Sequence, residues 1–250
     1  MWTRNDWKTH CDSILDYFEH NREAFRNILQ RTIDRPMLPP PPRESPVTIL
    51  FVGHTPKKLK NNFFGRSRDE AFNRAQNLRY VGVGRRQMVY NTYYSPLVSL
   101  AKIVSPSFGV WWEVEQDRVA KHKIEFTDLC HLPFTNDKEY EKVLTPAAQV
   151  ALNAARVPNF QEFCREHLKR EILHMKPKVV VCNGVKTANA VRHISGILSQ
   201  FDPATDSPHF FSNVLKTHVH LSGFMTPPRP LDVFNQARIA SEIRQALGRF

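Results

Sequence analysis

Four short runs that read as strands, each ending at a turn with polar residues, recur along this chain with helical patterns between them. The runs are residues 48–52, 123–128, 178–182 and 213–220. Repeated alternation of strand and helix is typical of a parallel sheet with helices on both faces. We therefore expect an α/β fold of three layers, α/β/α, around a central, mainly parallel four-stranded sheet.

The segments outside these runs predict the helices and the domain organisation. Residues 1 to about 33 have apolar residues at helical spacing. The proline-rich run from Pro36 to Pro46 cannot be helical and should form an extended connector. We expect an N-terminal helical extension and connector, residues 1–45, followed by an α/β domain, residues 46–250. Helices of that domain are expected near residues 69–79, 95–104, 145–155, 159–174, 184–198 and 230–248.

Net charge, cysteine spacing and the length of apolar runs indicate which partners and cofactors the protein could bind. The 250 residues carry a formal charge of +11, with a pI near 9.7, which fits either a nucleic-acid partner or a merely basic protein. The four cysteines form no CxxC pair, so we expect no metal site and no cofactor. The start of the chain has no signal-peptide pattern, and no run approaches the roughly 20 apolar residues of a membrane helix. We expect a soluble, cytoplasmic monomer without a membrane partner.

The turns after the four predicted strands carry the candidate functional residues. They are residues 53–56, 127–130, 182–184 and 220–224. In open α/β sheets the carboxyl ends of the strands line the ligand crevice. We therefore expect these four turns to form one site.

Three residues in these turns suggest specific roles, each with a structural alternative. Gly53 lets the backbone turn sharply and approach a ligand. His220 either directs its imidazole at a ligand oxygen or is an ordinary loop histidine, and His218 competes for the role from the same sheet face. Asp128 is costly to bury without a donor, so it either caps the next turn or recognises a ligand amine.

Taken together, these residues resemble the uracil-DNA glycosylase superfamily. The family has Gly-x-x-Pro after its first strand and His-x-Ser or His-Pro-Ser after its last, with a base-reading Asn between them. Gly53-His54-Thr55-Pro56, Phe126-Thr127-Asp128-Leu129 and His220-Leu221-Ser222 occupy those places here, and residues 177–184 are similar to the third strand and turn of the family. The resemblance covers about residues 47–248.

The resemblance implies that an extruded nucleotide is held in a pocket and that its N-glycosidic bond is cleaved. It gives His220 the role of a donor to the base oxygen as charge develops there. Phe64, rather than Phe63, should stack on the base. The resemblance places Gly53, Asp128 and Asn183 around the base, with a duplex wedge just after His220. The DNA contacts expected from the sequence are Lys57, Lys58, Ser222, Phe224, Met225 and Arg229, with Lys60, Arg66, Arg68, Arg85 and Arg86 as further phosphate candidates.

The chain departs from the family pattern where water would be activated. Many members carry Asp or Asn where this chain has Thr55, preceded by His54. A threonine can orient water but cannot act as a general base at neutral pH. His54 titrates in the useful range and is the second candidate.

Two further departures concern the base. An ionised Asp128 in place of Asn only accepts hydrogen bonds, so it suits the N4 amine of cytosine and repels O4 of uracil. Lys57 stands where strict uracil enzymes carry a tyrosine that excludes 5-substituted pyrimidines. We therefore expect a DNA glycosylase that excises a 5-modified cytosine, such as glucosylated hydroxymethylcytosine of phage DNA, in antiviral defence.

Three alternatives remain open from the sequence. One is a repair glycosylase for uracil or mismatched bases. Another is a non-catalytic DNA-binding module of the same fold, which the missing acid at Thr55 would favour. A third is an unrelated nucleotide-binding domain, although the chain has neither GxGxxG nor a Walker loop.

Overall fold

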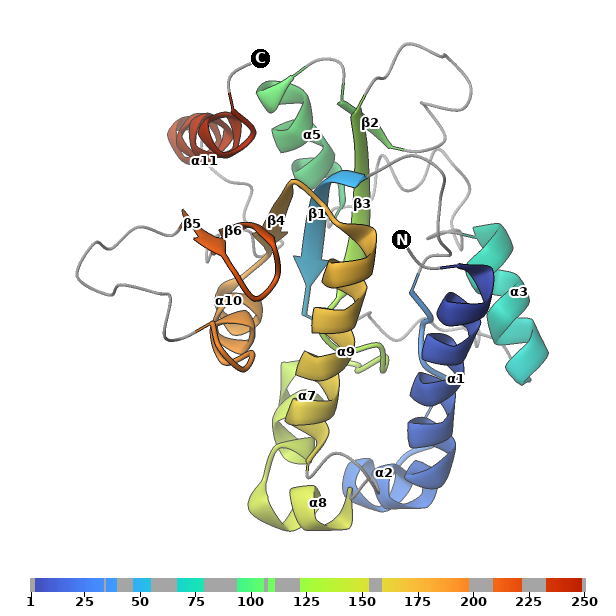
Figure 1. Ribbon diagram of the computed structural model, residues 1–250. Coiled ribbons are helices and arrows are strands. Elements are labelled where there is room, and N and C mark those ends of the chain that lie inside the picture. The colour runs from blue at the N-terminus through green and yellow to red at the C-terminus, as the bar shows by residue number, and fades with distance from the viewer. Residues whose placement is uncertain are drawn as a thin grey trace.

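The centre of the molecule is a six-stranded sheet in the order β2-β3-β1-β4-β6-β5 (Figure 1). The computed structural model describes residues 3–33, 35–39, 47–54, 67–78, 94–105, 108–110, 122–152, 159–197, 209–221 and 233–248. The strands are β1 Val47–Gly53, β2 Phe108–Val110, β3 His122–Asp128, β4 Val179–Cys182, β5 His209–Ser212 and β6 Thr217–His220. The four predicted runs thus supply the four central strands.

All pairings are parallel except that of β5 with β6, which is antiparallel. Every residue of β1 and β4 is buried. Strands covered on both faces read as continuous apolar runs rather than as alternating patterns. The α/β prediction with a mainly parallel sheet is therefore confirmed.

Only the second half of the last predicted strand, residues 213–220, is a strand, β6, and β5 precedes the predicted segment. Residues 213–216 form a turn between β5 and β6, and Lys216 adopts a left-handed conformation with φ 56°. β5 and the short edge strand β2 extend the expected four-stranded sheet on either side.

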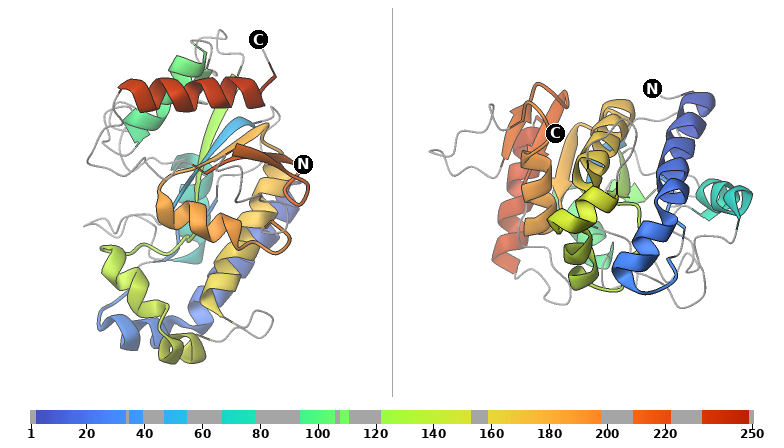
Figure 2. Two further views of the ribbon diagram at one scale, coloured as in Figure 1. Left: turned by 90° about the vertical axis from the view of Figure 1, so that its left-hand side faces the viewer. Right: turned by 90° about the horizontal axis from the view of Figure 1, so that it is seen from below.

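Helices cover both faces of the sheet (Figure 2). On one face, α5 (Tyr94–Val104) and α11 (Val233–Ala246) pack over Phe51, Phe126 and Val181. The other face, which includes Val52 and Val180, packs against the remaining layer. That layer contains α7 Asp137–Val143, α9 Phe160–Met175 and α10 Val185–Arg192, while α8 Pro146–Ala151 lies next to α7 and α2.

The N-terminal helices α1 (Arg4–His20) and α2 (Arg22–Leu29) pack onto the second layer. Phe18 and Phe25 belong to the same core cluster as Val52 of the sheet. The start of the connector is also held, because the Trp7 indole donates to the Pro39 carbonyl at 3.0 Å. Residues of the predicted extension therefore share a core with the α/β domain, while the boundary at residue 45 stays a prediction.

Helix α3 (Arg68–Leu78) is tied to α1 by charge. The Arg68 guanidinium bonds to the carboxylates of Asp12 at 2.6 Å and Asp16 at 2.8 Å. Because these ion pairs already engage the Arg68 guanidinium, Arg68 is a poor candidate for a phosphate contact. Within the described residues, no helix is both long enough and apolar enough to cross a membrane.

Candidate functional site

Four of the predicted site residues lie at one edge of the sheet. Gly53 pairs with Asp128 across β1 and β3, and Val181 pairs with His220 across β4 and β6. The Asn183 backbone N–H donates to the Val52 carbonyl at 2.8 Å, which places Asn183 beside the end of β1. The carboxyl ends of the four central strands therefore bring these residues together, as the turns predicted.

Asp128 and His220 also share a face of the sheet. Side chains alternate between faces along a strand, so residues two apart point the same way. Asp128 follows by two positions Phe126 of the same strand, which packs against the α5–α11 layer. His220 contacts Glu242 of α11 directly. The candidate site thus lies at the carboxyl edge, on the face covered by α5 and α11.

Asp128 is the buried carboxyl group of this edge, with 4% of its surface exposed. Removal from water raises the pKa of Asp128 to about 7. The nearby His131 opposes this rise, and the negative charge of Glu171 adds to it. Asp128 is therefore an acid that changes charge near neutral pH, able to donate below about pH 7 and only to accept above it.

His220 is almost fully buried and is held by the last helix. Its Nε2 bonds to Oε2 of Glu242, and the other oxygen of Glu242 accepts from Arg238 Nη1 at 2.7 Å. Nδ1 is buried, and no other residue of the described part of the chain bonds to it. Burial lowers the pKa of His220, although Glu242 works in the opposite direction.

The competitor His218 has a different environment. Its Nδ1 lies 3.2 Å from Nε2 of His209 on the edge strand β5, and its ring is partly exposed. His218 is therefore engaged with the sheet edge, and His220 is the histidine of the pair tied to α11.

The Asn183 side chain is also buried, with 5% exposure. Its Oδ1 accepts no hydrogen bond from the residues that the structure describes. Buried polar atoms are nearly always paired, so an unpaired amide oxygen beside Gly53 is suited to a ligand donor or to bound water.

His54 lies next to Gly53, on the opposite side of the strand end. Its ring packs edge-on against Tyr140 of α7, with the centroids 4.2 Å apart. Burial lowers the pKa of His54 to about 4, with Asp137 opposing the shift. A histidine with so low a pKa is a weak proton acceptor at neutral pH.

A buried polar network supports β3 from the other face. The fully buried Glu171 of α9 accepts hydrogen bonds from Thr127 Oγ1 at 2.6 Å, His131 Nε2 at 2.7 Å and His10 Nε2 at 3.1 Å. Glu171 was not among the residues predicted from the sequence. The available signal was a glutamate beside Leu168 and Ile172 within the buried stripe of an amphipathic helix.

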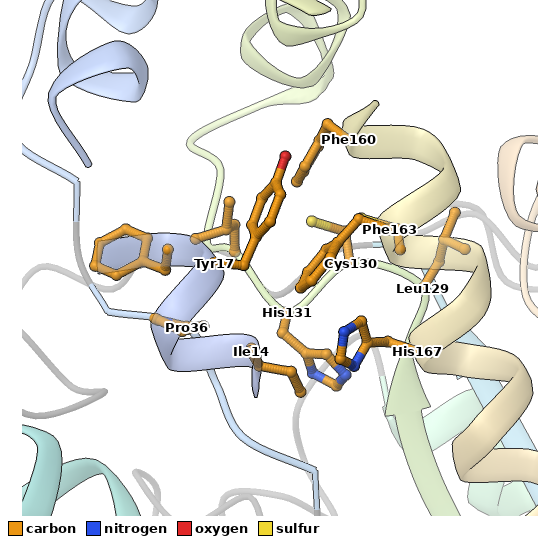
Figure 3. Close-up of a pocket in the computed structure, with 12 residues that line it drawn as sticks. Ile14, Tyr17, Pro36, Leu129, Cys130, His131, Phe160, Phe163 and His167 are labelled. Atoms are coloured by element: carbon orange, nitrogen blue, oxygen red, sulfur yellow. The ribbon is translucent and has the colours of Figure 1, made fainter. Parts of the chain in front are cut away.

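An apolar pocket lies between α1 and α9 (Figure 3). Tyr17 and Phe163 stack across it with ring centroids 3.7 Å apart. Its lining includes His131 and His167 but none of Asp128, Asn183 and His220. We therefore interpret it as a gap in the packing of α1 on α9 rather than as a base pocket.

Several predicted residues lie outside the described part of the chain. They are Thr55, Lys57, Lys58, Phe64, Ser222, Phe224, Met225 and Arg229, together with Lys60, Arg66, Arg85 and Arg86. Among the residues that are described, no group of three or more His, Cys, Asp or Glu side chains is arranged to hold a metal ion.

Comparison with known families agrees with the geometry of this edge. The model of the uracil DNA glycosylase superfamily matches residues 42–238, which include all four strand-end turns. A search of the curated proteins finds no match. The family match spans most of the chain, and the chain therefore belongs to the uracil DNA glycosylase superfamily.

Proposed function

We propose that this protein is a DNA glycosylase that flips a 5-modified cytosine out of DNA and hydrolyses its N-glycosidic bond, leaving an abasic site. Members of the superfamily are generally DNA glycosylases, and glycosylases of this fold act on DNA. The observation that carries the substrate proposal is the buried Asp128 carboxyl group at the position where the family reads the base.

The protonation of Asp128 supports a cytosine derivative. Both the neutral acid and the carboxylate have an oxygen that accepts from the N4 amine of cytosine. Only the neutral acid donates to O4 of uracil. Because the pKa of Asp128 is raised to about 7, a substantial fraction is ionised at neutral pH and above. The acceptor for the N4 amine of cytosine is therefore kept over the whole pH range, whereas the Asp128 donor for O4 of uracil is lost as the pH rises.

The remaining roles rest on the sequence resemblance. Lys57 stands where strict uracil enzymes carry a tyrosine that excludes 5-substituted pyrimidines, which supports a 5-substituted substrate. An enzyme that excised ordinary cytosine would damage its host, so a foreign modified base, as in phage DNA, supports a defensive role. Phe64 is proposed to stack on the base, with Lys57, Lys58, Ser222, Phe224, Met225 and Arg229 contacting DNA. His220 and Asn183 are proposed to act beside the scissile bond and the base.

A second candidate function is repair of uracil. The specific observation in its favour is the same raised pKa, since a protonated Asp128 offers the donor that O4 of uracil requires. A protonated carboxylic acid presents the same donor and acceptor pair as the amide of asparagine. The two candidates therefore differ in their pH dependence, which makes them separable by experiment.

We expect purified protein to produce abasic sites in DNA carrying a 5-modified cytosine. The test offers matched duplexes with uracil, thymine opposite guanine, cytosine, hydroxymethylcytosine or glucosylated hydroxymethylcytosine at one position. The His220→Ala variant should be about 100- to 10,000-fold slower, the usual contribution of a proton-transferring side chain. Circular dichroism of the variant checks that it folds.

The same assay separates the alternatives. Cleavage of uracil with modified cytosine untouched would overturn the substrate proposal and favour repair. Tight DNA binding without excision of any base would favour the non-catalytic module.

A further inference from the structure

We propose that His220 and Glu242 form a carboxylate–histidine pair in which His220 Nδ1 takes the proton of the attacking water and Glu242 positions the ring. The inference rests on the proposed glycosylase function. It assigns the water-activating step, which the first motif of the chain leaves open. It also gives His220 a role different from that implied by the resemblance alone.

The hydrogen bond between the two residues fixes where the ring proton lies. As a carboxylate, Glu242 can only accept a hydrogen bond, so Nε2 of His220 must donate. A neutral imidazole with its proton on Nε2 has a lone pair and no proton on Nδ1. His220 in this state has an acceptor at Nδ1 and no second proton to give to a base oxygen.

The second nitrogen of the ring is left for a ligand. Nδ1 of His220 is buried and meets no donor among the described residues. A buried acceptor without a partner costs free energy that a bound water or substrate would recover. Glu242 thus binds Nε2 of the ring, and Nδ1 is the nitrogen that can accept a proton.

Charged and titratable neighbours favour the neutral ring at rest. Glu242 and Arg238 face His220 from α11, and their charges act in opposite directions on its pKa. His209 of β5 stacks on the ring with centroids 6.3 Å apart, and His218 belongs to the same strand, β6. Burial is the largest influence and lowers the pKa of His220, so the ring is largely neutral at pH 7 and can accept a proton.

The other candidates for this task are weaker. Thr55 lacks a group that titrates near neutral pH. His54 is turned toward Tyr140, and its pKa of about 4 makes it a poor acceptor. His220 with Glu242 has the arrangement in which a carboxylate fixes the tautomer of a histidine base and stabilises its charged form.

In the proposed step, the water oxygen bonds to C1′ of the sugar while the bond from C1′ to the base nitrogen breaks. The electron pair of that bond leaves with the base, and one water proton moves to Nδ1 of His220. Glu242 stabilises the resulting imidazolium through Nε2–H. The ring then releases its proton to the departed base, so the products are an abasic sugar and the neutral base.

The test is the single-turnover excision rate from about pH 4.5 to 6.5, a range below the pKa of Asp128. For the wild-type chain, the rate should not fall as the pH rises, and it should have levelled off by about pH 6.5, because the lowered pKa of His220 keeps the ring largely neutral there. The Glu242→Gln variant should be about 100-fold slower or worse, because an amide can donate to Nε2 and shift the ring proton to Nδ1. Gln245→Ala, on an exposed position of the same helix, should match the wild-type rate.

A rate that falls as the pH rises over this range would overturn the proposal, since it would mean that protonated His220 acts as a donor. An undiminished Glu242→Gln rate would also overturn it. Nitrogen NMR of labelled histidines gives a second readout without substrate. The His220 signal, assigned by its loss in His220→Gln, should show the Nε2–H tautomer in the wild type and lose it in Glu242→Gln. Because this readout needs no DNA cleavage, its failure is distinct from failure of the proposed function.

Discussion

We expect the Asp128→Asn variant to excise uracil and to shift the ratio of uracil to cytosine-derivative excision toward uracil by about 10- to 100-fold at pH 8. The side chain keeps its size and its place at the end of β3, opposite Gly53. An uncharged amide offers O4 of uracil a donor and N3–H an acceptor, which the ionised carboxylate cannot do together. A well-placed pair of hydrogen bonds is worth about 1–3 kcal/mol of discrimination between bases, which corresponds to the expected change in this ratio.

The pH dependence of the wild-type enzyme should show the same preference. Only the protonated form of Asp128 can donate to O4. This form is lost as the pH rises through its pKa of about 7. Excision of uracil, where it occurs, should therefore decline between about pH 6 and 8. Acceptance of the N4 amine needs no proton on Asp128 and should not decline for that reason. The ratio of cytosine-type to uracil excision is thus expected to increase with pH, and this dependence should vanish in Asp128→Asn.

Single-turnover rates on matched duplexes measure both effects. Asp16→Asn serves as the control, because it makes the same chemical change on the exposed face of α1. Asp128→Asn should also fold at least as stably at pH 8 as the wild type. The raised pKa means that ionising Asp128 in the folded state costs free energy, starting above its unfolded value of 3.8 and complete above about 7. If the variant keeps the base preference and pH profile of the wild type, Asp128 does not read the base.

The sequence predicted the edge of the sheet well because that edge depends on local patterns. Apolar runs fix where β1 and β4 end, and parallel pairing then brings their following residues together regardless of side-chain detail. Gly53, Asp128, Asn183 and His220 were found in this way. The β5–β6 hairpin was missed because Val214 and Leu215 continue the apolar pattern through what is in fact a turn closed by Lys216.

The partners of these residues could not be predicted, because they come from distant helices. Glu242 faces the sheet only because α11 packs over Val181, and its side chain looks like any polar residue of an amphipathic helix in the sequence. A bond between residues 22 positions apart in the chain depends on how α11 packs, which no local pattern specifies. The pKa of Asp128 likewise depends on burial, which the sequence does not give.

The largest effect on stability is expected at Glu171, where Glu171→Ala should lower the free energy of unfolding by about 3–5 kcal/mol at pH 6. The variant would leave the hydroxyl of Thr127 and the imidazoles of His10 and His131 buried without their shared acceptor. These three groups belong to β3, α1 and the turn after β3. The loss should therefore loosen both the docking of α1 and the strand end that carries Asp128.

The pH dependence of this effect follows from the pKa values of Glu171 and His131. The histidines hold the pKa of Glu171 well below its unfolded value of 4.5, so its contribution is present above that value and is lost as the pH falls through the folded pKa. The carboxylate raises the pKa of His131 above its unfolded value of 6.5, so that contribution is present below 6.5 and is lost as the pH rises. The difference between wild type and variant should be largest from about pH 4.5 to 6.5.

Urea unfolding at about pH 3, 6 and 8 measures this difference. The matched control is Glu166→Ala on the same helix, which removes a partly exposed ion pair with Lys169 and should cost less than about 1 kcal/mol. Glu171→Gln separates charge from hydrogen bonding. It keeps an acceptor for Thr127, so it should be less destabilising than Glu171→Ala, but it should lose the pH dependence of the pair. If Glu171→Ala lowers the free energy of unfolding by no more than Glu166→Ala does, the buried network does not hold α1 and the end of β3 together.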